Sequence, residues 1–357
     1  MKIETDESFY KSEAVYQRSS AIKTFSACSW SYYCNYVLKI PHMDNEGALQ
    51  GNVCHSFFEC LLNPRHKKHW KPIVKAGTVC ASSACERLVR KLIRKNKLPS
   101  VDKTFNRIDG MILVGLKADF YVKGGKLVGK EWRFKIENES PKYRIYGTID
   151  KINIIEKDKV IQIDDFKSSK QKYSGEDAEA GIQALIYSLA CKKKWPDYKP
   201  KMRFIFLQFP DDPFQEVEFS DDVLAGFEHY LENTQKKFEE FTEQHAYLNF
   251  AFDQGMPKDG SFSGALSCGF AKRPNQLKKD GTPMWHCPFK FAYTYYIVKK
   301  DGKIIKSYLN KEDIRLNDGE IIEEARYEGC PRFRDKVGEL PDAQVVKPVV
   351  DNFLDDF

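Results

Sequence analysis

The chain has 357 residues, of which 42% are hydrophobic and 30% are charged, and its formal net charge is +6. This composition is typical of a soluble globular protein with one large domain or two medium-sized ones, and no apolar run approaches the roughly 18 residues of a membrane span, so no membrane-spanning helix is expected. The acidic and polar start of the chain is unlike a signal peptide, so we expect a cytoplasmic location.

Three local clusters of basic residues stand out, at residues 65–69, 87–97 and 192–194. Each cluster can contact the phosphates of a nucleic acid, and each is equally typical of a solvated helix face. The small net charge therefore permits a nucleic-acid partner without requiring one. The ten cysteines of a cytosolic chain are expected to be reduced, buried or metal-bound rather than joined in disulfides.

The N-terminal part of the chain leads into a predicted helix. Residues 1–23 show little periodicity and have the character of an arm, and residues 24–36 are rich in aromatic side chains and cysteine. A helix is predicted over residues 47–63, where an Asn-Pro step ends it. His55 and Glu59 lie four residues apart on the side of this helix that faces away from its apolar stripe. They form either part of a site or a solvent-facing pair.

Two further segments precede the centre of the chain. Residues 80–98 contain a predicted helix that is basic on one side, and residues 109–135 are predicted to be rich in strand, with a turn at 123–126. Glu131 lies near the end of this strand-rich segment. It is either an exposed strand residue or an acidic member of a site.

The centre of the chain is a predicted β-hairpin with strands over residues 146–155 and 159–167. If the polar turn is centred between them, Asp150 lies directly opposite Asp165. Side chains alternate along a strand, so Lys167 shares the face of Asp165. Two carboxylates and an ammonium group then converge, which suits a divalent cation with oxygen ligands and a lysine beside it.

Asp164 is the sequence neighbour of Asp165, but alternation turns its side chain to the opposite face of the sheet. Only Asp165 has the Asp-x-Lys spacing to Lys167, so we assign the site to Asp165. A β-bulge in this strand would exchange the two carboxylates.

The next part of the chain completes an α/β pattern. A helix is predicted over residues 175–195, with Gln183 and Tyr187 one turn apart, followed by an apolar strand over 202–208 and a long helix over 220–244. Beyond about residue 248 the chain has turns rich in Gly, Pro and Lys. The phosphate-binding loop of an ATPase motor is absent from the sequence.

Five motifs follow one another along the chain: Gly51-x-x-x-His55, Glu131, Gly147-x-x-Asp150, Asp165-x-Lys167 and Gln183-x-x-x-Tyr187. Together they resemble the PD-(D/E)XK nuclease superfamily, and the last motif resembles its RecB-type branch, which includes phage and bacterial exonucleases and CRISPR adaptation nucleases. The resemblance covers roughly residues 24–190. It implies an α/β fold of restriction-endonuclease-like type, with a mixed central sheet flanked by helices.

The resemblance also suggests a division of the chain. We expect an N-terminal arm and strap over residues 1–45, a nuclease core over 46–247, and a cysteine-containing extension with an acidic tail over 248–357.

The resemblance implies roles for individual residues. Asp150, Asp165 and Lys167 would be catalytic, and Gln183 and Tyr187 would face the nucleic acid and the catalytic hairpin. The metal ligands would be His55, Asp150, Asp165 and the backbone carbonyl of Phe166, with Glu131 near the metal. A nitrogen ligand among oxygens makes Mn²⁺ a plausible activator alongside Mg²⁺. Lys167 would orient the attacking water and offset negative charge.

The function expected from this resemblance is a metal-dependent DNA nuclease, an exonuclease that acts on single strands or DNA ends. Aromatic side chains near Gln183 and Tyr187 would suit single strands, because bases stack on aromatic rings. The setting would be recombination, repair or phage DNA metabolism in a bacterial or phage-infected cell. One alternative is an end-trimming nuclease of CRISPR adaptation, which would need integrase partners. Another is a non-catalytic DNA-binding subunit on a nuclease scaffold, against which the complete His/Asp/Asp/Lys set argues.

Several members of the family carry a 4Fe–4S cluster held by one cysteine before the nuclease core and three after it. Here Cys34, with Cys28 as a rival, would be the first ligand, and Cys268, Cys287 and Cys330 follow the core. The family's close C-terminal Cys-x-x-Cys pair is absent. An iron–sulfur cluster, a zinc site and reduced structural cysteines are therefore all open.

The chain ends in an acidic tail, residues 350–357, which contains two phenylalanines. Such a tail can dock a protein partner, compete with DNA for a basic cleft, or act as a solubilising end.

Overall fold

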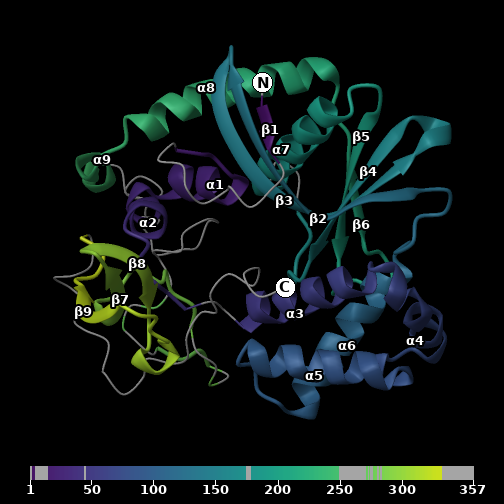
Figure 1. Cartoon of the computed structure of the whole chain (residues 1–357), viewed down its shortest axis with the longest axis horizontal. Helices are drawn as coiled ribbons and strands as arrows, with labels where there is room; N and C mark the ends of the chain where they lie inside the picture. The colour runs from purple at the N-terminus through teal and green to yellow at the C-terminus, as the bar shows by residue number, and fades with distance from the viewer. Residues whose placement is uncertain are drawn as a thin grey trace. The chain divides into compact units, whose positions relative to one another are not determined.

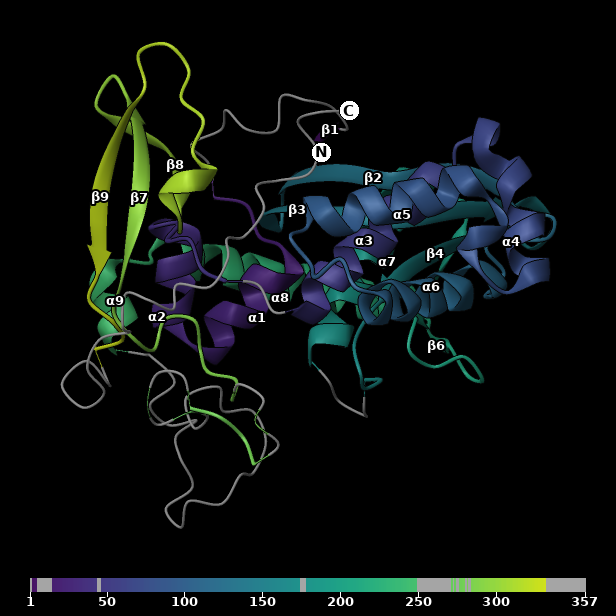
Figure 2. The same ribbon diagram turned by 90° about the horizontal axis from the view of Figure 1, so that it is seen from below.

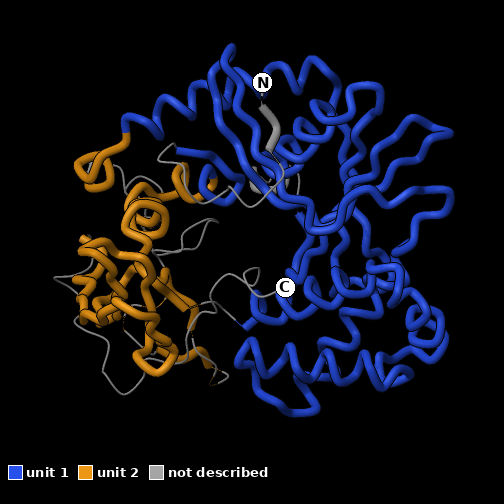
Figure 3. The backbone as a smooth tube through the Cα atoms, in the orientation of Figure 1, with its two compact units in different colours: residues 1–22, 45–240 blue, residues 23–44, 241–357 orange. Residues whose placement is uncertain are grey.

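The computed structural model describes residues 2–4, 15–43, 46–173, 178–248, 271, 273, 276–279, 281 and 284–331. The chain forms two compact units (Figure 3). Unit 1 contains residues 1–22 and 45–240, and unit 2 contains residues 23–44 and 241–357. Residues 23–44, which directly precede the expected nuclease core, thus belong with the C-terminal part of the chain.

A six-stranded sheet forms the centre of unit 1, in the order β1-β2-β3-β4-β5-β6 (Figure 1). Its strands are β1 (Lys2–Glu4), β2 (Lys126–Glu139), β3 (Lys142–Ile155), β4 (Val160–Lys167), β5 (Lys199–Phe206) and β6 (Phe214–Val217). The pair β4 and β5 is parallel and every other pair is antiparallel. This mixed sheet with flanking helices confirms the predicted restriction-endonuclease-like fold class.

The central hairpin has the predicted register. Lys151 pairs with Asp164 and Ile152 pairs with Ile163, so Asp150 and Asp165 stand opposite each other one position beyond the last pair. The turn between the strands is a short 3-10 helix (Glu156–Asp158) followed by Lys159, whose φ is 51°. Alternation along β4 therefore sends Asp165 and Lys167 to one face of the sheet, as expected.

Two sets of helices cover this sheet. The helices α3 (Glu46–Leu61), α4 (Trp70–Ala76), α5 (Ser83–Lys95) and α6 (Asp102–Lys117) lie together below the sheet in Figure 1. The helices α7 (Ala178–Lys194) and α8 (Asp221–Glu239) contact its strands on the other side. Phe58 of α3 packs on Phe166 of β4, with ring centroids 4.3 Å apart, which anchors the first set to the strand that carries Asp165.

One segment differs from its prediction. Residues 109–117, which were expected to be rich in strand, belong to the helix α6. Phe105, Ile108, Ile112 and Leu116 recur at helical spacing and are all buried, so packing of this stripe outweighs the strand preference of the β-branched residues. The predicted long helix over 220–244 is also divided, because α8 ends at Glu239 and α9 (Glu243–Leu248) follows.

Unit 2 contains a three-stranded antiparallel sheet in the order β8-β7-β9 (Figure 2). Its strands are β7 (Tyr293–Lys300), β8 (Lys303–Tyr308) and β9 (Ile321–Tyr327), and its helices include α2 (Ser29–Tyr32) and α9. Trp30 Nε1 donates a hydrogen bond to the hydroxyl of Tyr327 (2.7 Å), which itself donates to the carbonyl of Phe289 (2.8 Å). These bonds tie the 23–44 segment into the core of unit 2.

Across the described part of the chain, none of the helices combines the length and apolar character that crossing a membrane requires.

Candidate metal centre

Three side chains from three different elements meet beside the central hairpin. His55 of α3, Glu131 of β2 and Asp150 of β3 each offer a ligand atom, and these atoms all lie within 4.8 Å of one another. His55 Nδ1 is 3.2 Å from Asp150 Oδ2, and the same oxygen accepts a hydrogen bond from the backbone N–H of Phe166 (2.7 Å). Within the described ranges this is the one group of three or more His, Cys, Asp or Glu side chains with such spacing.

Glu131 reaches this group through an unusual backbone conformation. The pairs on either side of it, Lys130 with Lys151 and Trp132 with Ile149, place it opposite Asp150. Its φ is 42°, in the left-handed region that costs a non-glycine residue about 1–3 kcal/mol. Strain of this kind is concentrated at functional positions, and the strand pattern alone gave no sign of it.

Gly51 allows α3 to approach the end of β4. A Cβ atom at this position would lie 2.6 Å from the hydroxyl of Ser168, which donates a hydrogen bond to the carbonyl of Gly47 (3.2 Å). The glycine and the serine thus hold α3 against the end of the strand that carries Asp165 and Lys167. His55, one helical turn further along α3, is placed by this contact.

Gly51→Val is therefore expected to push α3 away from Ser168 and to lower the affinity of the site for Mn²⁺ by about 10–100-fold, the range seen when groups that orient a metal ligand are removed. Isothermal titration calorimetry measures the change. The matched control is Gly110→Val on the exposed side of α6, where an added Cβ atom would point into open space, and it should leave the affinity unchanged. Equal affinities for both variants would show that α3 does not need this contact.

Asp165 and Lys167 form a second group next to the first. Lys167 Nζ lies 2.7 Å from Asp165 Oδ2 and donates to Gln183 Oε1 at 2.7 Å. Gln183 Nε2 donates to Asp165 Oδ1 and to the hydroxyl of Tyr187, both at 3.0 Å. Gln183 and Tyr187 thus face the β3–β4 hairpin. Asp165 is not a member of the three-residue group; its Oδ1 accepts from Gln183 and its Oδ2 lies beside Lys167.

Tyr187 packs inside the protein. It is 7% exposed, and its ring meets that of Phe134 edge-on, with centroids 6.1 Å apart. Gly147 makes room for both rings, since a Cβ atom there would lie 2.7 Å from Phe134 and 3.3 Å from Tyr187. The described conformation leaves little of the tyrosine ring open for stacking on a base.

Burial and neighbouring charges shift the pKa values of the ionisable side chains in both groups. Burial lowers the pKa of His55, but the neighbouring Asp150 outweighs burial and raises it to about 9. Burial and then Asp150 raise the pKa of Glu131 to about 8. Burial likewise raises the pKa of Asp165 to about 6, whereas the pKa of Asp150 is lowered because His55 and the Phe166 N–H outweigh its burial. At neutral pH His55 and Glu131 therefore carry protons that a cation must displace.

Cation affinity is accordingly expected to rise with pH. His55 and Glu131 must lose their protons to act as ligands, so binding near pH 7 should release between one and two protons. The affinity for Mn²⁺ should increase by up to about a hundredfold per pH unit between about pH 6.5 and 8, and should level off above the His55 pKa of about 9. Calorimetry in buffers of different ionisation enthalpy counts the protons, and binding without proton release would contradict the ligand set.

Asp164 belongs to a different, fully buried network on the other face of the sheet. Lys151 Nζ is 2.7 Å from Asp164 Oδ2, and Arg203 Nε is 2.7 Å from Asp164 Oδ1. Lys151 also donates to the carbonyl of Phe120 (2.9 Å). No bulge exchanges the two carboxylates, since β4 pairs regularly with β3 and β5. Alternation along the strand predicted the face of Asp164 correctly but did not identify Lys151 and Arg203 as its partners.

The predicted cysteine ligands and the acidic tail lie in unit 2 or outside the described residues. Cys34 and Cys330 are buried in one hydrophobic cluster, and Cys28 and Cys287 pack against it. Cys34 Sγ lies 3.8 Å from the hydroxyl of Tyr327, and burial raises the pKa of the thiol to about 12. Cys268 and the acidic tail at 350–357 lie outside the described residues. For Phe166 the N–H contact to Asp150 is seen, and the carbonyl as a ligand stays a prediction.

The model of the PD-(D/E)XK nuclease superfamily matches residues 19–271, well over half of the chain. The chain belongs to this superfamily. No curated protein matches it. Within the PD-(D/E)XK nucleases the donor set of this chain fits a divalent cation, because two carboxylates and an imidazole within 4.8 Å are ligands that Mg²⁺ and Mn²⁺ accept. A metal-dependent nuclease that cleaves DNA is what membership of this family indicates.

Proposed function

We propose that this PD-(D/E)XK protein is a metal-dependent DNA exonuclease of the RecB-type branch, which digests single strands or DNA ends in recombination, repair or phage DNA metabolism. The observation that carries the proposal is the convergence of His55, Glu131 and Asp150 beside the Asp165–Lys167 pair. A protein that only binds nucleic acid gains nothing from holding an acidic residue, Glu131, at positive φ beside the carboxylate of Asp150. A hydrolytic metal centre does, because it needs carboxylate ligands close together.

Each residue of the site would have a separate role in hydrolysis. His55, Glu131, Asp150, Asp165 and the carbonyl of Phe166 would hold Mg²⁺ or Mn²⁺, which when bound lowers the pKa of water and offsets charge on the phosphoryl group.

Lys167 would act as a cation. Burial disfavours its charge, but Asp165 outweighs burial and raises the pKa of Lys167 above its ordinary range. The ammonium group would therefore orient the attacking water and stabilise the negative charge of the transition state rather than accept a proton. Gln183 would fix both partners, since its amide accepts from Lys167 and donates to Asp165.

Cleavage of three labelled DNA substrates tests this proposal. Linear single strands, linear duplexes and closed single-stranded circles would be incubated with Mg²⁺, Mn²⁺ or EDTA. An exonuclease should shorten the linear strands progressively in either metal, leave the circle intact and be inactive in EDTA. Cleavage of the circle would reject exonuclease action, and binding without cleavage in any metal would point to a non-catalytic subunit.

We also propose that unit 2 holds an iron–sulfur cluster. Supporting this, Cys28, Cys34, Cys287 and Cys330 gather around one hydrophobic cluster although they come from distant parts of the chain. Zinc suits them less, because a tetrahedral zinc site holds its sulfur ligands about 3.8 Å apart, and no three of the described cysteines bring their sulfur atoms within 4.8 Å of one another. A larger cluster needs wider spacing. Cys268 competes for the fourth ligand position.

Anaerobically purified protein is expected to be brown and to contain iron and sulfide. The variant Cys34→Ser should lose the colour, whereas Cys191→Ser, at a buried cysteine of unit 1, should keep it. Colourless protein without iron would reject the cluster and show that these cysteines are structural thiols. A cluster would also favour the CRISPR-adaptation alternative, for which binding to an integrase partner is the further test.

A further inference from the structure

The helical layer next to the metal centre has an unusually one-sided charge. Residues 60–101 contain eleven lysines and arginines and a single acidic residue, Glu86. Glu86 is paired with Arg90 at 2.9 Å. The side chains of Arg87, Lys91 and Arg94 are exposed along α5. The layer therefore presents far more positive charge than its own acidic residue can neutralise.

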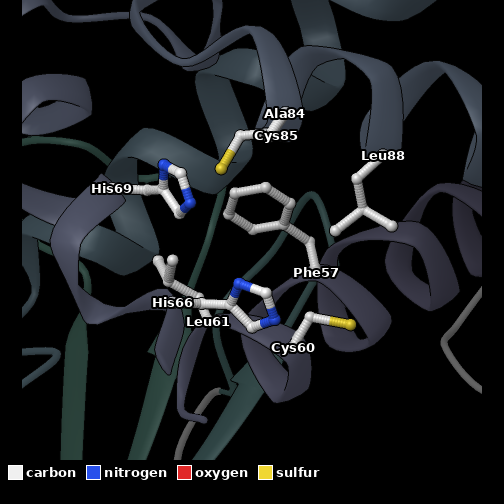
Figure 4. A pocket seen from close by; sticks show the side chains of 8 residues that line it. All are labelled: Phe57, Cys60, Leu61, His66, His69, Ala84, Cys85 and Leu88. Atoms are coloured by element: carbon white, nitrogen blue, oxygen red, sulfur yellow. The ribbon is translucent and has the colours of Figure 1, made fainter. Parts of the chain in front are cut away.

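A small apolar pocket of about 250 Å³ opens within this basic layer (Figure 4). Phe57 of α3 and Leu88 of α5 contribute to its apolar wall. The rings of His66 and His69, from the 3-10 helix Pro64–His69, also line it, and they stack with centroids 6.1 Å apart and an interplanar angle of 27°. The 3-10 helix and α5, which carry most of the lining residues, also carry basic side chains of the layer.

The pocket and the metal centre share helix α3 of unit 1 but lie on different sides of it, because Phe57, Cys60 and Leu61 project roughly 140–240° around the helix from His55. Helix α3 carries His55 of the metal centre and Cys60 of the pocket wall. Strand β2 carries Glu131 of the metal centre and, next to it, Lys130. Burial raises the pKa of Cys60, and the charges of Lys130 and Arg65 act against that rise. Lys130 thus lies close enough to Cys60 for its charge to act on the thiol.

We propose that this basic layer and its pocket bind single-stranded nucleic acid on the α5 side of helix α3, with phosphates on the exposed side chains of α5 and one unstacked base in the pocket. The proposal rests on the proposed nuclease function and adds where the substrate strand lies. Positive side chains that follow the backbone, combined with rings on which bases stack, are how single strands are held. A duplex keeps its bases stacked inside, so it can use the charges but not the pocket.

Binding in EDTA, where no cleavage occurs, separates the two contributions. Fluorescence anisotropy would measure the affinity for a labelled single strand and a labelled duplex at several salt concentrations. The double variant Lys91→Gln/Arg94→Gln should reduce the slope of log affinity against log salt by about 1.4 for the single strand, since each phosphate contact contributes about 0.7. Lys157→Gln/Lys237→Gln removes two exposed charges elsewhere in unit 1 and should leave the slope unchanged.

Ala84→Leu tests the pocket. Ala84 is an exposed residue at its rim, so leucine should narrow the pocket without disturbing the core. The affinity for the single strand should fall about tenfold, the order expected for the loss of one stacked base, and the salt slope and the affinity for the duplex should stay constant. Circular dichroism would verify that each variant is folded.

Two results would overturn the inference. One is a salt slope of the α5 variant equal to that of the control variant, and the other is an Ala84→Leu protein that binds the single strand as tightly as the wild type or loses both substrates equally. Hydrolysis of bis(p-nitrophenyl) phosphate, which is too small to reach the basic layer, reports on the metal centre alone. An active centre with unaffected binding in the variants would therefore reject this inference and leave the proposed function intact.

Discussion

Lys167→Ala is expected to retain binding of both DNA and Mn²⁺ and to cleave DNA about a thousandfold more slowly than the wild type. Lys167 is the cation nearest to Asp165, at 2.7 Å, and it is held by Gln183 at the same distance. Removal of one fixed group that stabilises transition-state charge typically costs a factor of about 100–1000 in rate, and orientation of the water adds to that. Single-turnover cleavage rates at saturating enzyme measure this step directly.

The matched control is Lys170→Ala, three residues further on. Its side chain is exposed and lies outside the catalytic network, so its cleavage rate should equal that of the wild type. A Lys167→Ala protein that cleaves at the wild-type rate would remove this lysine from the mechanism. Loss of DNA binding in the same variant would show that Lys167 holds the substrate rather than the transition state.

The second large effect concerns stability. Asp164→Ala is expected to lower the free energy of unfolding by about 3–5 kcal/mol, the usual result of removing one partner of a buried ion pair. Lys151 and Asp164 are both fully buried, and Arg203 is nearly so. The substitution would leave two buried cations without their shared carboxylate. Urea unfolding followed by circular dichroism measures the change.

The double variant Asp164→Ala/Lys151→Met separates charge from packing. It removes the buried ammonium together with the carboxylate, and it should recover part of the lost stability, because replacing a buried ion pair costs less than breaking one. A single Asp164→Ala variant as stable as the wild type would mean that the network contributes no net stability. A double variant less stable than the single one would assign the loss to packing.

The centre of the fold could be predicted because its determinants are local. The register of β3 and β4 followed from the position of the polar turn, and the alternation of side chains then determined the faces of Asp164, Asp165 and Lys167. Gln183 and Tyr187 lie one turn apart on α7, and it was the resemblance to the family, not a local pattern, that implied that they face the hairpin.

Other features depend on contacts that no local pattern encodes. Glu131 meets Asp150 because its backbone turns into the left-handed region, which a strand-like sequence does not reveal. Part of helix α6 was mistaken for strand because of its β-branched residues. Gly115 is needed there because a Cβ atom would lie 2.4 Å from Phe58 of α3, a contact known only from the packed structure.

The contacts between the cysteines of unit 2 could not be predicted either, because these residues lie far apart in the sequence. Cys34 and Cys330 stand almost 300 residues apart in the sequence and share one core. Their meeting depends on the three-stranded sheet of unit 2, whose strands β7 to β9 mix aliphatic residues with tyrosines and charged residues without a clear alternation. From the sequence, only turns with scattered aromatic residues were expected in that region.

The central claim is that phosphodiester hydrolysis takes place where His55, Glu131 and Asp150 meet. The most direct test compares the wild type with Asp150→Asn in single-turnover cleavage of an end-labelled single strand, in Mn²⁺ and in EDTA. We predict cleavage by the wild type in Mn²⁺ only, and none by Asp150→Asn in either condition although it is folded and binds DNA. Equal cleavage by the two proteins, or cleavage that persists in EDTA, would contradict the account.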